Sequence, residues 1–151
     1  MGSLFAFTLT AHIVMGVVAV IATFLVLLNL LKDEPSIKRM RDMSLLASLG
    51  YFLSWFSGGY YYWFWYGGNV KPIIKEGDYA WAHLVVMEAK EHIFLLLPIM
   101  SLVTLGFTYM SGKRLMLDSE FKSAVTYFVA VSFALAVLIT LSGIIISGGA
   151  R

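Results

Sequence analysis

Cysteine is absent from this chain of 151 residues. Its absence excludes disulfides, thiolate metal sites, iron–sulfur clusters and covalent attachment of a c-type haem. Charged residues are also scarce, at 13%, whereas 60% of the chain is hydrophobic and 15% is aromatic. This balance is far from that of soluble proteins and is typical of an integral membrane protein. Any cofactor must therefore be held by histidine, methionine, carboxylates or shape.

Four apolar stretches reach the length of about 20 residues that a helix needs to cross a bilayer. They cover residues 4–31, 43–65, 81–110 and roughly 121–146. They predict an all-α fold, an integral membrane four-helix bundle formed by a single transmembrane domain over residues 1–151. The helices are expected at about residues 4–32, 36–66, 79–110 and 119–147.

The distribution of lysine and arginine predicts how these helices are oriented, because such residues favour cytoplasmic loops. The loops after the first and third stretches hold most of the cations: Lys32, Lys38, Arg39, Arg41, Lys113, Arg114 and Lys122. The middle loop has only Lys71 and Lys75. Both termini are therefore expected outside the cell inner (cytoplasmic) membrane. A signal peptide is not expected, since no cation precedes Leu4.

Ionisable residues are concentrated at the start of the third stretch. They are His83, Glu88, Lys90, Glu91 and His92, and an unbroken apolar run over residues 93–110 follows them. Such groups are costly in a membrane segment and usually functional there. Glu88 and His92 are four residues apart and so share one face of a helix. Pro98 removes one backbone donor and predicts a kink about one turn beyond His92.

Two histidines are predicted to lie at one depth in the membrane. Counted from Leu31, His12 lies about 28 Å along its helix, and counted from Met110, His92 lies about 27 Å along its own. Two imidazoles at one level suit axial ligation of a single b-type haem near the outer face. Met15 is an alternative ligand on the first helix.

Other residues would complete such a haem site. Gly16 belongs to a stripe of small residues whose first explanation is plain helix packing, and the same stripe would let a flat ring approach. Lys71, Lys75 or Lys90 would pair with the haem propionates. The aromatic run over residues 58–68 reads chiefly as an interfacial belt.

The same residues support other interpretations. His12, Glu88 and His92 would form a transition-metal site, and Glu88, Glu91 and His83 would transfer protons, with His83 at the surface beyond the lipid. Alternatively, His12 is only hydrogen-bonded to a threonine or a backbone carbonyl, and His92 is an interfacial residue paired with a carboxylate. No hydrolytic, nucleotide-binding or nucleic-acid-binding motif is present.

The sequence TAHIVMGVVAV at residues 10–20 is similar to the first-helix histidine pattern of copper-resistance-D-like four-helix proteins. Histidines on the first and third of four short-looped helices likewise resemble small bacterial membrane b-type cytochrome subunits. The resemblance implies a haem, with His92 as the counterpart on the later helix.

The leading hypothesis is a membrane electron-transfer subunit, the cytochrome b subunit of an oxidoreductase, that moves electrons between quinol and an external redox partner. It would work with other membrane or periplasmic redox subunits or as a homo-oligomer. A metal or proton transporter centred on His12, Glu88 and His92 is the first rival. A structural accessory subunit of a larger membrane complex is the second.

Overall fold

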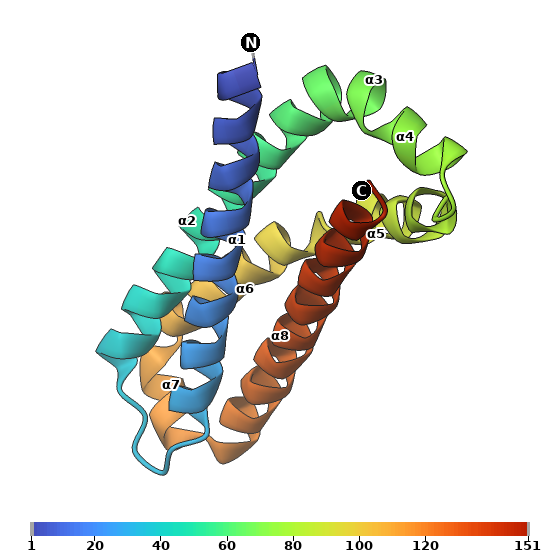
Figure 1. Cartoon of the computed structure of the whole chain (residues 1–151). Helices are drawn as coiled ribbons and strands as arrows, with labels where there is room; N and C mark the ends of the chain where they lie inside the picture. The colour runs from blue at the N-terminus through green and yellow to red at the C-terminus, as the bar shows by residue number, and fades with distance from the viewer. Residues whose placement is uncertain (1, 151) are drawn as a thin grey trace.

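The computed structural model describes residues 2–150, and every regular element in that range is helical. The long helices are α1 (Gly2–Leu30), α2 (Ile37–Tyr61), α6 (Leu96–Met110) and α8 (Ser119–Gly148). The short ones are η1 (Tyr62–Tyr66), α3 (Gly67–Asn69), α4 (Lys71–Glu76), η2 (Ala82–Met87), α5 (Glu88–Ile93) and α7 (Gly112–Leu117). Both chain ends lie at one end of the molecule, here called the terminal end (Figure 1). The α1–α2 connection and α7 lie at the opposite, loop end.

Three helical segments are long and apolar enough to cross a membrane: α1, the stretch Ala82–Met110, and α8. The prediction of an all-helical membrane protein is confirmed at this level. At 25 residues α2 has the length of a crossing, but it does not reach the same hydropathy. Its serines and glycines and its Trp and Tyr side chains account for the shortfall.

Close approach of two backbones explains the pairing of α1 with α2. A Cβ atom added to Gly50 of α2 would lie 2.9 Å from Cβ of Ala19 and 3.0 Å from the Met15 carbonyl oxygen on α1. Only glycine fits at such a distance, and small residues are the usual means of helix contact in a membrane. The helices are therefore in direct contact near their middle.

The α1–α2 turn is fixed by a buried side chain at the end of α1. The Asn29 amide donates to the Ser36 carbonyl at 2.9 Å, and its oxygen accepts from the Ser36 backbone N–H at 3.3 Å. Ser36 in turn caps α2 by accepting from the Arg39 backbone N–H. The start of the second helix near Ser36 agrees with the sequence-based prediction.

The third predicted helix is divided into η2, α5 and α6. Helical hydrogen bonding is interrupted at Phe94 and Leu95, and the Leu97 N–H bonds three residues back to the Phe94 carbonyl. Pro98 has no N–H to donate to Phe94, so the interruption falls one turn before the proline. The segment before it carries the ionisable residues, and this segment lies beside the terminal end of α8 (Figure 1).

Helix α8 begins at a carboxylate cap that gives stability a dependence on pH. Asp118 accepts from the Phe121 backbone N–H at 2.9 Å and also pairs with Arg114 at 3.0 Å. These bonds, the backbone bond first, lower the pKa of Asp118 from its ordinary 3.8. A lowered folded-state pKa means that the stabilisation is present above pH 3.8 and is lost as the pH falls through the lowered value.

We therefore expect the unfolding temperature to fall in acid, with part of that fall due to Asp118. Asp118→Asn is the matched control, because asparagine caps a helix about as well but does not titrate. Comparing the unfolding temperature of both proteins between neutral and acidic pH measures the contribution. Identical pH profiles would contradict the assignment.

Candidate functional site

His12 lies on the face of α1 that packs against α2. Its Nδ1 is 2.8 Å from the Ser54 carbonyl oxygen and 3.0 Å from the Ser54 hydroxyl, which donates to the His12 carbonyl at 2.9 Å. A carbonyl oxygen only accepts, so the imidazole carries its proton on Nδ1 and donates it to Ser54. The second ring nitrogen, Nε2, is left with a free lone pair.

Gly58 makes room for the His12 ring. A Cβ atom at this position would lie 2.8 Å from Cε1 of His12 and closer still to Nδ1. Real side chains do not tolerate such contacts, so any residue larger than glycine would displace the imidazole. The neighbouring Gly59 has no atom near its Cβ position and carries no such constraint.

His92 lies on α5, and its side chain is exposed. Its Nδ1 is 2.7 Å from the carbonyl oxygen of Glu88, one turn earlier on the same helix. As at His12, the carbonyl places the proton on Nδ1 and leaves Nε2 as the free nitrogen. No hydrogen bond joins His12 to His92 among the contacts of residues 2–150.

Gly16 serves the contact between α1 and α2. A Cβ atom at Gly16 would lie 3.2 Å from the Ser54 hydroxyl, so the absent side chain lets Ser54 reach His12. The small-residue stripe predicted on α1 therefore packs, at Gly16 and Ala19, against a neighbouring helix. Met15 precedes it and is half-buried.

Lys90 extends from α5 toward α8. A Cβ atom at Gly143 of α8 would lie 3.5 Å from Nζ of Lys90, and the lysine side chain is half-buried. Lys90 is thus directed at the neighbouring helix α8.

His83 is buried, with 1% of its surface exposed. The prediction that it lies at the surface was therefore wrong. Its Nδ1 is 2.9 Å from the hydroxyl of Tyr66, which is also buried, and the two rings are 5.8 Å apart. Ile74 of α4 and Ile146 of α8 pack in the same cluster. The segment between α2 and η2 folds back at the terminal end of α8 and encloses the imidazole.

Two carboxylates lie close to the His83–Tyr66 pair. Oε1 of Glu88, which is half-exposed, is 4.0 Å from Nε2 of His83. Glu91 has a buried oxygen, Oε1, that no hydrogen-bond donor reaches, and its charge acts on the hydroxyls of Tyr62 and Tyr66. A buried, unpaired carboxylate oxygen is costly and is a place where a proton or a donor can bind.

No metal centre is assembled from these residues. Within residues 2–150, no three His, Asp or Glu side chains come close enough to hold a metal ion. The predicted set of His12, Glu88 and His92 is therefore not gathered. His12 and His83 instead belong to two separate groups, one formed by His12 and Ser54 and one by His83, Tyr66 and Glu88.

Two partners of these groups were missed by the sequence analysis, namely Ser54 and Tyr66. A signal for Ser54 was available, because Ser44, Ser48, Tyr51 and Ser54 recur at helical spacing and form one polar face of α2. Tyr66 lies in an aromatic run that reads as a membrane belt, so nothing in its neighbourhood singled it out.

Comparisons with known proteins give no relative: no protein-family model, curated protein or solved structure matches this chain.

Proposed function

We propose that this chain is a multi-pass subunit of the cell inner membrane that holds one b-type haem near the outer face. It would exchange electrons between quinol and an external redox partner, with His12 and His92 as the axial ligands. The observation that carries the proposal is shared by the two histidines. Each has Nδ1 on a backbone carbonyl and Nε2 free, and histidines that bind metals are commonly oriented and made more basic by such a bond.

The donor set of the chain fits a haem on chemical grounds. Imidazole is the common axial ligand of b-type haems, and a bound haem would supply a one-electron redox couple. Ser54 and Gly58 fix the His12 ring against α2, while the exposure of His92 leaves its Nε2 accessible. Lys90, whose Nζ reaches Gly143 of α8, offers a cation for a propionate, and Met15 is the alternative ligand one turn from His12.

The orientation proposed for the chain places its loop end in the cytoplasm, with α2 as a fourth crossing. Most of its lysine and arginine residues lie on the α1–α2 connection, the start of α2, α7 and the start of α8. Positively charged loops remain on the cytoplasmic side. The terminal end, with the His12 and His83 groups nearer to it, would then face outward.

The His83 group would handle protons in this function. Oxidation of a quinol releases protons along with electrons, so an acceptor is needed where the quinol binds. Nε2 of His83 and the carboxylates of Glu88 and Glu91 are candidate acceptors, and the Tyr66 hydroxyl holds Nδ1 of His83 in place. Lys71 and Lys75 add positive charge around His83.

The visible spectrum of the protein, purified from cells supplied with haem, tests this function. We expect a Soret band, and sharp α and β bands on reduction with dithionite, at about one haem per chain. A colourless protein in its folded state would overturn the proposal. Metal analysis of the same sample would then separate a metal transporter from an accessory subunit.

A further inference from the structure

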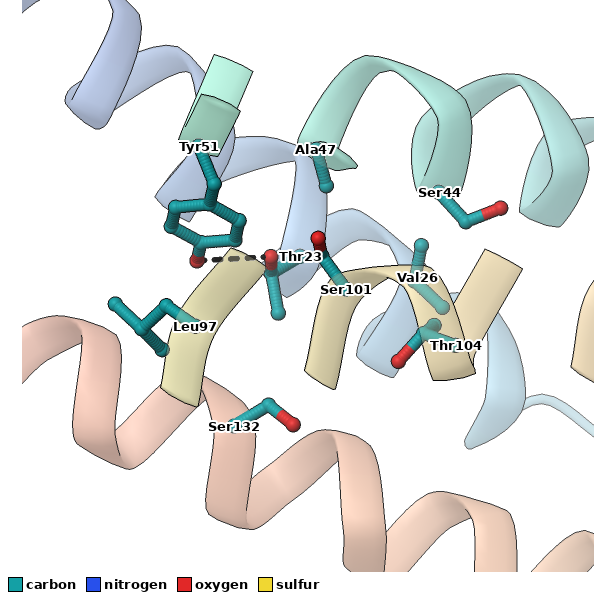
Figure 2. Close-up of a pocket in the computed structure, with 9 residues that line it drawn as sticks. All are labelled: Thr23, Val26, Ser44, Ala47, Tyr51, Leu97, Ser101, Thr104 and Ser132. Atoms are coloured by element: carbon teal, nitrogen blue, oxygen red, sulfur yellow. Dashed lines mark hydrogen bonds between the residues drawn. The ribbon is translucent and has the colours of Figure 1, made fainter. Parts of the chain in front are cut away.

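A small cavity lies in the middle of the molecule, where α1, α2, α6 and α8 meet (Figure 2). The volume within which the centre of a water-sized sphere can move is about 10 Å³. This is roughly the volume that one water molecule needs by the same measure. Six of the nine residues that line the cavity carry a hydroxyl group, although most of the surface facing it is hydrocarbon. The lining residues are Thr23, Val26, Ser44, Ala47, Tyr51, Leu97, Ser101, Thr104 and Ser132.

The hydroxyl groups on three of the walls have already donated their protons. Thr23 donates to the Ala19 carbonyl at 2.9 Å, Ser101 to Pro98 at 2.7 Å, Thr104 to Met100 at 3.0 Å and Ser132 to Phe128 at 2.8 Å. Each of these bonds returns to the backbone of the residue's own helix. A hydroxyl has one proton and two lone pairs, so each of these oxygens remains able only to accept.

The fourth wall, α2, follows the same pattern. The Tyr51 hydroxyl is 3.1 Å from Oγ1 of Thr23, and because the Thr23 proton is committed to Ala19, Tyr51 is the donor of that bond. Ser44 bonds to the Arg41 carbonyl and to the Thr108 hydroxyl. The hydroxyl oxygens that line the cavity are therefore able only to accept, and no free donor remains among the lining side chains.

These acceptors are buried, with 1–7% of each residue exposed. Each of these hydroxyl oxygens already takes part in at least one hydrogen bond, and a remaining lone pair can accept another. An occupant that bonds to them must therefore be a hydrogen-bond donor. It must also be no larger than a water molecule.

We propose that the cavity is a binding site for one structural water molecule, which donates to hydroxyl oxygens on different helices. Two donated bonds would join, for example, the Thr104 oxygen of α6 to the Ser132 oxygen of α8. The water thereby links helices whose own hydroxyl protons are spent within each helix. This inference is independent of the haem, since none of the lining residues belongs to the His12 or His83 groups.

An experimental structure of the full chain in lipid at about 2 Å resolution tests the proposal. We expect one isolated density peak in the cavity, about 2.7–3.2 Å from at least two of the hydroxyl oxygens. The peak should persist when sodium is replaced by choline in all buffers. An empty cavity, or a peak that disappears with sodium and so marks a bound cation, would overturn it.

Substitution of Thr104 by valine gives a second test, because it replaces the hydroxyl with a methyl group of the same shape. Thr140→Val is the matched control, since Thr140 makes the same bond to the carbonyl four residues earlier, at 2.8 Å, but lies exposed and away from the cavity. With a water present, Thr104→Val should lower the unfolding temperature by roughly 2–6 °C more than Thr140→Val. Equal shifts, or a gain for Thr104→Val, would contradict the proposal.

Discussion

For the proposed haem site, replacing His12 with alanine should remove more than about 90% of the haem absorbance per chain, because a missing axial ligand would leave the iron held on one side only. His92→Ala should have a similar effect for the same reason. The measurement is the ratio of the Soret band to the protein band after purification. Circular dichroism of the same samples would show that both variants remain helical.

Two adjacent glycines provide a matched control that leaves both histidines in place. Gly58→Ala puts a methyl group into the His12 ring, whereas Gly59→Ala meets no atom within 4 Å. The haem content should therefore fall for Gly58→Ala and stay at the wild-type level for Gly59→Ala. Full haem content in Gly58→Ala or in His12→Ala would show that the ring of His12 does not face a cofactor.

The largest effect on stability is expected at Gly50. Its Cβ position is 2.9 Å from Cβ of Ala19 and 3.0 Å from the Met15 carbonyl oxygen. Neither neighbour can rotate away, because one atom is fixed to the backbone and the other belongs to it. Gly50→Ala must therefore separate α1 from α2, and overpacking of this kind costs about 1–3 kcal/mol. Thermal unfolding in detergent followed by circular dichroism measures this loss.

Gly59→Ala serves as the control for this prediction as well, since it changes the same residue type near the end of the same helix. With open space around its Cβ position, it should leave stability unchanged or raise it by about 0.5–1 kcal/mol, because alanine restricts the unfolded chain. Equal losses for the two variants would contradict the close α1–α2 contact, because the effect would then come from α2 itself.

Helix positions were largely predictable because they depend on local properties of the chain. Runs of apolar residues fix where a segment crosses the bilayer, and capping residues such as Ser36 fix where it begins. Pro98 predicted the interruption of the third segment for an equally local reason, the loss of one backbone donor. By hydropathy alone, however, α2 differs from the other three membrane-length segments, because its Trp, Tyr and serine residues lower its mean hydropathy.

The arrangement of the candidate site was predictable only in part. Counting residues from the helix ends predicts the heights of His12 and His92 for unbroken helices, whereas the structure interrupts the third segment between α5 and α6. The count also does not give the direction in which each side chain points around its helix. That direction depends on which helix is the neighbour. The structure directs Nδ1 of His12 to Ser54 on α2 and leaves His92 exposed on α5.

The burial of His83 could not be inferred from its position in the sequence. Depth counting places it above the lipid, where a histidine is ordinarily in contact with water. Burial arises because η1 supplies Tyr66 and α4 supplies Ile74, which pack in one cluster with Ile146 at the end of α8 beside His83. Contacts of this kind join parts of the chain that are far apart in sequence, and no local pattern encodes them.

The pairing of α1 with α2 is complete within one hairpin. Its contacts, from Asn29 with Ser36 at the turn to His12 with Ser54 near the other end, require no residue beyond these two helices. Contacts between neighbouring segments form without waiting for long stretches of chain. The first two helices alone therefore supply the partner that fixes the tautomer of His12, independently of the segment that carries His92.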